Sequence, residues 1–343
     1  MTPWLSALAG DNDITALLAD DAQLAAMLAV EVALAEASAD CGWISDAAAA
    51  AIKDAIAGFV PDHAQLAAGM LADGVVVPAL LRQLRTRVDP AHADALHRGA
   101  TSQDIIDTAL MLSLARIFDL YEARLTGLLA EFEALARSAG ERPLLAHTRM
   151  QAALPTRWRA KIDSWAEPLR RHRQALTAMR GTLLVVQLGG PVGDRESFEG
   201  HGGAIAAGMA RRLDLGMATP WQATRDPIVA LGNLLALISG SLGKFGADVA
   251  LLAQTEVGAL RLEGAGGSSS MAHKANPVAA EVLVALARSN AGLSGTLGQA
   301  MVHEYERSGA AWTLEWLTLP PMLVTTGASL RLSLRLLEQL RLV

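Results

Sequence analysis

The sequence contains almost no cysteine and few aromatic residues. Its 343 residues include one cysteine, Cys41, which excludes an internal disulfide and favours a reducing compartment. Aromatic residues make up 4% of the chain, whereas 52% of it is hydrophobic and consists mainly of alanine and leucine. Because β-proteins are rich in β-branched and aromatic residues, this balance predicts an all-α protein.

Several other features that would indicate a class of protein are also missing. With 29 basic and 35 acidic residues and no basic block, the chain is an unlikely nucleic-acid binder. The amino terminus lacks a secretory pattern, and the most apolar run, residues 228–242, is interrupted by polar residues and too short to span a bilayer. No metal-ligand spacing is present. We therefore expect a cytoplasmic protein with no metal, membrane or nucleic-acid partner.

Two long segments carry apolar residues at spacings of three and four, which is the pattern of long helices. In the first segment, residues 104–138, these are Leu114, Ile117, Tyr121, Leu125, Leu128, Phe132 and Leu135. In the second they are Ile228, Leu231, Leu235, Ile238, Leu242, Phe245, Val249 and Leu252. The second segment is also apolar outside this seam, so its helix needs neighbours on several sides. We expect a bundle whose helices also pack against other subunits; one self-contained bundle is the alternative.

The pattern changes along the chain and predicts two domains. Residues 1–100 have the character of several short helices, with breaks at Gly10–Asp13, Cys41–Gly42, Phe59–Asp62 and Asp89–Pro90. Long helices dominate afterwards. We therefore expect an N-terminal helical domain over residues 1–100 and a central long-helix bundle domain over residues 101–343.

A polar loop over residues 264–278 interrupts this helical pattern. It contains Gly-Ser-Ser-Ser-Met-Ala-His-Lys-Ala-Asn-Pro from residue 267 onward, where glycine and serine are poor helix formers. Ser268 could transfer a proton only if backbone N–H groups and Lys274 stabilised its alkoxide. Asn276 and Glu281 lie close by, Glu281 on the helix that follows. A flexible polar linker is the alternative interpretation.

Two further segments are suited to binding anions. Thr101 and Ser102 stand where a helix begins, and their hydroxyls with the helix N-terminus could seat an anion or serve only as a cap. His147, Arg149 and Gln151 lie in a basic turn region that is suited to carboxylate recognition, because arginine offers two parallel donors. A solvated basic patch is the alternative there.

Two other segments have less specific signals. Arg225 stands at the entrance of the seam helix, either as an ordinary surface arginine or as a substrate ligand. Residues 189–193, Gly-Gly-Pro-Val-Gly, match neither a P-loop nor a dinucleotide-binding fingerprint, so we interpret them as a tight connection between long helices.

Taken together, these segments resemble the fumarase/aspartase superfamily. The loop is similar to its signature, Gly99–Thr108 to its first shared region, and Thr148–Pro155 to its second; Glu304–Ser308 also falls where relatives carry similar residues. The resemblance implies a homotetramer without a cofactor, whose active sites are each built from three subunits. It also implies that Ser268 acts as the base and that Lys274 and Asn276 hold a carboxylate. The C-terminal helical domain of longer relatives is expected to be missing or minimal.

Departures from the family pattern indicate the reaction. Many relatives carry, where Arg149 stands, a histidine that acts as general acid, and residues 73–78 also lack the histidine of their first domain. A guanidinium stays protonated near neutral pH and does not replace that acid. Forming a lactone needs no such acid, since a carboxylate oxygen is the attacking group. Ala272 and Ala275 also depart from the signature.

The resemblance therefore implies a cycloisomerase of protocatechuate catabolism acting on the tricarboxylate 3-carboxy-cis,cis-muconate. Its implied substrate ligands are Thr101, Ser102, His147, Arg149, Gln151, Arg225 and Asn276. Ser268, Lys274 and Glu281 are the implied catalytic residues, with Glu281 orienting Arg149. A sulfo-substrate cycloisomerase, an adenylosuccinate-type lyase and an inactive structural family member are the alternatives.

Overall fold

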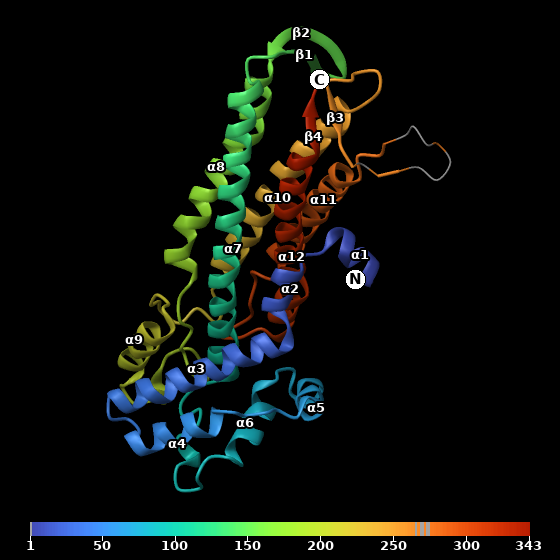
Figure 1. Ribbon diagram of the computed structural model, residues 1–343. Coiled ribbons are helices and arrows are strands. Elements are labelled where there is room, and N and C mark those ends of the chain that lie inside the picture. Colours follow the sequence, from blue (N-terminus) through green and yellow to red (C-terminus); the bar gives the residue numbers. More distant parts are fainter. Residues whose placement is uncertain (1, 265, 268–270, 272–274) are drawn as a thin grey trace.

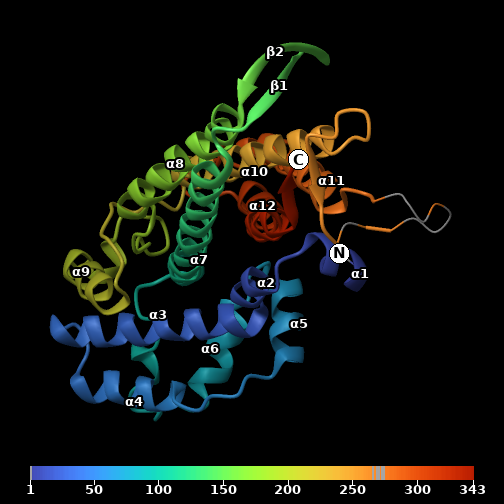
Figure 2. The same cartoon turned by 45° about the horizontal axis from the view of Figure 1, so that its top comes forward.

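The computed structural model describes residues 2–264, 266–267, 271 and 275–343. Long helices run side by side as an elongated bundle, with most of the N-terminal helices across one end and a β-hairpin at the other (Figure 1). The view in Figure 2 shows the same layering, with α3 lying across the ends of the long helices. The expected all-α fold is confirmed.

The N-terminal helices are short apart from α3, as the breaks in the sequence predicted. They are α1 (Pro3–Ala9), α2 (Asn12–Leu18), α3 (Asp20–Asp40), α4 (Asp46–Ile56), α5 (His63–Asp73) and α6 (Val77–Arg85), followed by the 3₁₀ turn η1 (Ala93–Ala95). The later helices are α7 (Ser102–Ala139), α8 (Trp158–Leu183), η2 (Glu196–Phe198), α9 (Gly202–Leu213), α10 (Asp226–Leu252), α11 (Val278–Gln299) and α12 (Gly309–Gln339).

The predicted seam of α10 forms the centre of the bundle. All eight seam residues are buried, and the helix packs against α8, α11 and α12. Two glycines permit the close approach of α11: a Cβ at Gly243 would lie 2.5 Å from the Cβ of Ala287, and one at Gly246 would lie 2.6 Å from the Ala280 carbonyl oxygen. The seam therefore sets which face is buried, and the glycines set how closely α11 packs.

The helix α7 links the two ends of the molecule. At about 1.5 Å per residue, its 38 residues span roughly 57 Å. Six of its seven predicted seam positions, from Leu114 to Phe132, are fully buried, and Leu135 is partly buried. Thr101 thus lies at one end of the bundle, and the segment after Ala139 lies at the other.

Buried apolar residues form two clusters rather than one. The larger fills the bundle, and the smaller joins α3, α4 and α6 to the start of α7. The smaller cluster also includes Phe198, Ile205 and Met209, which come from much later in the chain. The domain boundary at residue 100 stays a prediction, and the smaller core draws on residues from both sides of it.

Short strands were not predicted from the sequence. Among the described residues, β1 (Pro143–Thr148) pairs antiparallel with β2 (Gln151–Arg157), and β3 (Leu260–Leu262) pairs antiparallel with β4 (Leu340–Leu342). The region before α8, expected to be a turn, is therefore a hairpin. Its strands are mostly exposed, which explains the weak hydrophobic signal.

Two helices, α3 and α10, are long and apolar enough to cross a membrane by length and composition alone. For α10 this differs from the expectation for residues 228–242, because the helix extends over 27 residues. About half of each apolar window, 50% and 56% respectively, is buried inside the protein. Burial of this kind is the ordinary state of a core helix, so composition alone carries no membrane assignment.

Candidate active site

Asp104 anchors the first predicted anion-binding segment to the rest of the bundle. Its buried carboxylate accepts hydrogen bonds from the backbone N–H groups of Thr101 (3.0 Å), Gly189 (2.7 Å) and Gly190 (2.9 Å), and from Gln187 Nε2 (3.1 Å). Burial raises the pKa of Asp104, although the three backbone donors oppose the rise. The predicted connection at Gly189–Gly190 therefore also fixes the start of α7.

A cavity of about 470 Å³ lies beside this helix start. It is lined by Asp73, Gly74, Val75, Thr101, Ser102, Gln103, Arg307, Gly309, Trp312, Thr313 and Trp316. Arg307 is the positively charged member of this set, and its Nε donates to Gln103 Oε1 at 2.8 Å. Thr101 and Ser102 thus border a cavity with hydroxyls, a guanidinium and two tryptophans. Sequence reasoning did not select Arg307, although it lies in the Glu304–Ser308 segment that carried the resemblance.

Arg225 does not occupy the exposed position that a substrate ligand would need. Its side chain is fully buried between Asp107 and Glu315, with Nη1 2.7 Å from Asp107 Oδ2 and Nη2 2.6 Å from Glu315 Oε1. Nε also donates to Glu315 Oε2 at 3.0 Å, so every guanidinium nitrogen is hydrogen-bonded. The guanidinium also lies over the ring of Trp221, at 4.6 Å. The structure therefore contradicts the prediction of a substrate ligand and gives Arg225 a packing role.

The charges in this cluster stabilise one another. Burial lowers the pKa of Arg225, but Asp107 and Glu315 outweigh it, and the pKa lies above its ordinary value. Burial raises the pKa of Glu315, and the nearby guanidinium opposes that rise. Trp312 Nε1 lies 3.3 Å from Asp107 Oδ1, which connects this cluster to the wall of the 470 Å³ cavity.

The second predicted segment lies in the β1–β2 hairpin at the opposite end of α7. Arg149 and Met150 form its tip, with positive φ angles of 49° and 65°, and Thr148 pairs with Gln151. This two-residue turn usually carries Asn-Gly, because both central residues adopt left-handed conformations. The turn holds Arg149 and Gln151 at the end of an exposed hairpin.

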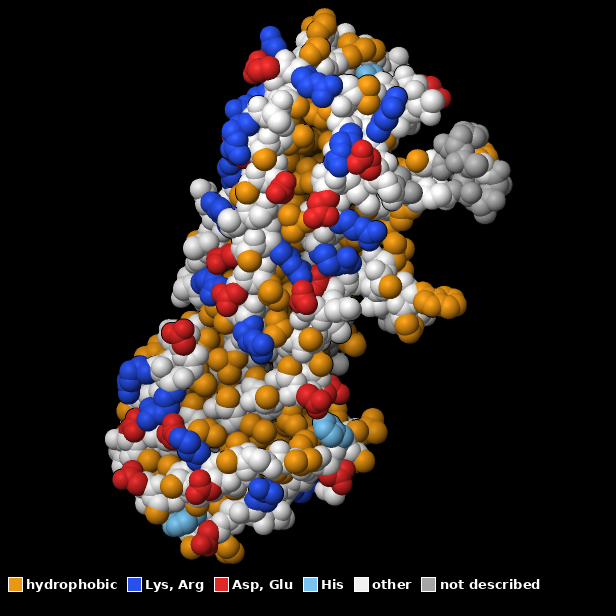
Figure 3. All heavy atoms as spheres, in the orientation of Figure 1, with side chains coloured by type: hydrophobic (Ala, Val, Ile, Leu, Met, Phe, Trp, Pro, Cys, Tyr) orange, Lys and Arg blue, Asp and Glu red, His pale blue; other side chains and the backbone are white. Residues whose placement is uncertain are grey.

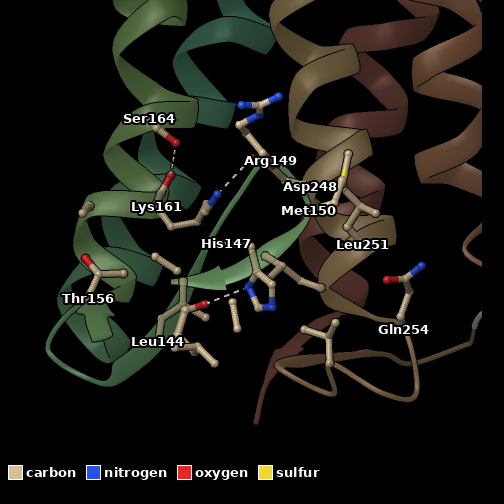
Figure 4. A pocket seen from close by; sticks show the side chains of 16 residues that line it. Leu144, His147, Arg149, Met150, Thr156, Lys161, Ser164, Asp248, Leu251 and Gln254 are labelled. Carbon is tan, nitrogen blue, oxygen red and sulfur yellow. Dashed lines mark hydrogen bonds and ion pairs between the residues drawn. The ribbon is translucent and has the colours of Figure 1, made fainter. Parts of the chain in front are cut away.

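A second cavity, of about 730 Å³, lies between this hairpin, α8 and α10 (Figure 4). Its lining includes His147 and Arg149 from the hairpin, Lys161 and Ser164 from α8, and Asp248 and Leu251 from α10. Lys161 Nζ lies 3.5 Å from Asp248, which also accepts from Trp165 Nε1 at 2.8 Å. His147 is held by its own strand, with Nδ1 3.2 Å from the Leu145 carbonyl oxygen. Arg149 is an exposed cation among the residues that line this cavity.

The base of the polar loop is fastened by backbone hydrogen bonds. Gly266 and Asn276 form an antiparallel bridge with N–O distances of 3.0 and 2.7 Å, and Asn276 Nδ2 lies 3.2 Å from the Gly267 carbonyl oxygen. Ser268 and Lys274 lie outside the described residues. Glu281 is exposed in the first turn of α11, and within the described part of one chain no ion pair joins it to Arg149.

Within the described part of one chain, these three regions lie apart. Thr101 and Arg149 lie at opposite ends of α7, and the base of the polar loop lies beside α11 (Figure 1). Among the residues that the structure describes, no group of three or more His, Cys, Asp or Glu is arranged to hold a metal ion. Each region carries anion-binding groups, but the described part of the chain forms no single pocket from all three.

The hairpin tip allows a direct test of backbone strain. A left-handed conformation costs a residue with a Cβ about 1–2 kcal/mol, so Met150→Gly should stabilise the hairpin by roughly 1 kcal/mol. Slower amide hydrogen exchange in β1 and β2 would measure the gain. Met150→Ala is the control, since it removes the side chain but keeps the Cβ. Equal stabilisation by both changes would argue against backbone strain.

Comparison with known proteins gives three kinds of match. The model of a family described as lyase matches residues 11–292. A 3-carboxy-cis,cis-muconate cycloisomerase of Pseudomonas aeruginosa is 38% identical over 95% of this chain and 72% of its own length. A nitrosuccinate lyase of Streptomyces davaonensis is 35% identical over 98% of this chain and 74% of its own. The crystal structure of the 3-carboxy-cis,cis-muconate lactonizing enzyme of Pseudomonas putida superposes with a TM-score of 0.93 at 34% identity, covering 100% of this chain and 78% of that one.

Proposed function

We propose that this chain, which belongs to the lyase family and to the fumarase/aspartase superfamily, is a cycloisomerase that converts 3-carboxy-cis,cis-muconate to a carboxymuconolactone. The observation that carries the proposal is Arg149 at the hairpin tip, where lyases of the superfamily use a proton-donating histidine. Two cycloisomerase matches, one by sequence and one by structure, support it.

The proposed reaction needs charge stabilisation more than acid catalysis. One carboxylate oxygen of the substrate attacks the conjugated double bond, and the electron pair moves toward the carbon α to another carboxylate. That carbon then accepts a proton and the lactone ring is complete. Fixed cations and N–H donors stabilise the negative charge that accumulates before protonation. A permanently charged Arg149 is suited to this role and not to donating the proton.

We assign roles to individual residues as part of this proposal. Ser268 transfers the proton, and Lys274 and Asn276 hold the carboxylate next to the reacting carbon. Thr101, Ser102 and Gln151 bind the other carboxylates, together with Arg149 and His147. Arg307 joins this group because it borders the same cavity as Thr101 and Ser102. Arg225 is excluded, since its nitrogens are already paired.

The proposal predicts turnover by the wild-type protein. Purified protein should consume 3-carboxymuconate, seen as loss of the ultraviolet absorbance of the diene, and the lactone should accumulate in equal amount. Nitrosuccinate is the necessary comparison, because a nitrosuccinate lyase is nearly as similar in sequence. Release of nitrite without lactone formation would reject the cycloisomerase and favour that lyase. The sulfo-analogue of the substrate and adenylosuccinate complete the panel.

We further propose that the active protein is a cytoplasmic homotetramer whose sites combine three subunits. The separation of Thr101, Arg149 and Asn276 in one chain supports this, since together they could meet only across copies. Exposed apolar side chains on the bundle point the same way: Leu237 is 58% exposed and Leu317 69%. Figure 3 shows hydrophobic side chains along the length of the bundle between lines of charged ones.

Mixing two strongly impaired variants tests whether the site is shared between subunits. Arg149→Met and Ser268→Ala should each lower turnover at least about 30-fold, and co-refolding them in equal amounts should restore it to roughly a quarter of the wild-type rate. The recovery is expected because random assortment places one intact Arg149 and one intact Ser268 in that fraction of sites. Mixing Arg149→Met with itself is the control. No recovery from the mixed pair would indicate that both residues serve a site within one subunit.

A further inference from the structure

A buried pair of titratable residues, His97 just before Thr101 and Glu31 on α3, has no part in the roles assigned so far. His97 Nδ1 lies 2.6 Å from Glu31 Oε1, and the side chains are 10% and 0% exposed. The second carboxylate oxygen, Glu31 Oε2, is buried and has no hydrogen-bond partner among the described residues. Buried polar atoms in proteins are nearly always satisfied, so the hydrogen bond to His97 is the one that the described residues give to this carboxylate.

The pair controls the backbone that leads into α7. His97 has a positive φ of 60°, which is strained for a residue with a side chain, and its carbonyl oxygen accepts from the Ala100 N–H at 3.3 Å. The next residue, Arg98, lies over the ring of Trp43 at 4.5 Å. Gly99 follows with a φ of 74°, and a Cβ there would lie 2.7 Å from Trp43. Three consecutive residues of this turn are thus fixed by tertiary contacts, and the hydrogen bond to Glu31 is the one that holds His97.

We propose that Glu31 is a positioning residue: through its hydrogen bond to His97 it holds the turn over residues 97–100 in the conformation that presents Thr101 and Ser102 to a substrate carboxylate. This inference rests on the proposed function, because it assigns those hydroxyls to tricarboxylate binding. Glu31 belongs to α3 and lines none of the cavities described above, so it acts through His97 and not on substrate.

The charges around His97 make the conformation of the turn over residues 97–100 depend on pH. Burial lowers the pKa of His97, but Glu31 outweighs this; Asp104 on α7 adds to the rise and Arg85 on α6 opposes it, so the pKa lies above its ordinary value. A raised histidine pKa contributes stability that is complete below the unfolded-state pKa and is lost as pH rises through the folded-state value. The turn should therefore loosen, and tricarboxylate binding weaken, on the alkaline side.

The test measures binding separately from turnover. Tricarballylate, a saturated tricarboxylate, is titrated calorimetrically into the full chain between pH 6 and 9. Glu31→Gln keeps the shape of the side chain but removes its charge. It should weaken binding at least about tenfold at neutral pH. It should also lower the alkaline midpoint, which is the pH at which half of the affinity is lost as pH rises. Glu36→Gln is the matched control, because Glu36 lies on the same helix in surface ion pairs with Lys53 and Arg212.

A double-mutant cycle separates positioning from general destabilisation. Adding Glu31→Gln to His97→Gln should cause no further loss of affinity, since the two residues act as one unit. Additive effects, or an unchanged affinity and alkaline midpoint in Glu31→Gln, would overturn the inference. Should Glu31→Gln fail to fold, His97→Gln is tested alone. For the inference to stand, its affinity for tricarballylate must no longer fall as pH rises toward 9. Wild-type protein that binds tricarballylate but leaves 3-carboxymuconate unchanged would reject the proposed function and not this inference.

Discussion

Arg225→Met should destabilise the protein by about 3–5 kcal/mol, because removing one partner of a buried ion-pair cluster leaves uncompensated charge in the interior. Asp107 and Glu315 are each 1% exposed and would both lose their cation. The methionine fills much of the same space, so the loss measures charge more than volume. Urea unfolding, followed by tryptophan fluorescence or circular dichroism, gives the free energy of unfolding for each variant.

A rescue variant shows whether stranded charge is the cause. Combining Arg225→Met with Asp107→Asn and Glu315→Gln removes the two carboxylate charges, so a large part of the lost stability should return. Stability that stays low in the triple variant would point to lost packing against Trp221 instead. If Arg225→Met were as stable as the wild type yet failed to bind a tricarboxylate, the original prediction of a substrate ligand would be restored.

Arg149→Met should have the opposite profile, with activity lost and stability kept. Arg149 is exposed at the hairpin tip, and its side chain takes part in no ion pair found among the described residues. If it binds a substrate carboxylate with two parallel hydrogen bonds, its removal should cost about 2–4 kcal/mol of transition-state stabilisation, or a ~30- to 1,000-fold fall in kcat/KM. Steady-state kinetics together with urea unfolding of the same preparation measure both quantities.

The conservative change distinguishes charge from geometry. Arg149→Lys keeps the positive charge but loses the planar pair of donors, so it should recover only part of the activity. A lysine variant with wild-type kinetics would mean that charge alone is needed at the hairpin tip. Wild-type kinetics in Arg149→Met would remove the main reason for preferring a cycloisomerase over a lyase.

The long helices could be predicted because their signal is local and repeated. In α10, eight apolar residues at spacings of three and four all became buried, since a helix turns residues so spaced onto one face. The start of α7 could also be predicted, because Thr101 and Asp104 form a cap within one turn. The hairpin could not be predicted, because its strands are short and mostly exposed and β2 contains Pro155.

The fate of Arg225 could not be predicted because its partners are distant in sequence. Asp107 lies 118 residues before it and Glu315 lies 90 residues after it. An arginine at a helix entrance looks the same in sequence whether its neighbours are solvent, substrate or buried carboxylates. The arrangement of the whole site is still harder to predict from the sequence, since Thr101, Arg149 and Asn276 do not meet within the described part of one chain.

The uninterrupted α7 also constrains how this chain can change length. Each residue added to an α-helix advances its end by about 1.5 Å and rotates it by roughly 100°. One inserted residue between Asp104 and Ala139 would therefore turn the hairpin, with Arg149, by more than a quarter of a circle relative to Thr101. Substitutions on the exposed face of α7 leave that angle unchanged. The helix thus fixes both the distance and the rotation between Thr101 and the hairpin. Length variation in related chains is therefore expected in the loops and not between Asp104 and Ala139.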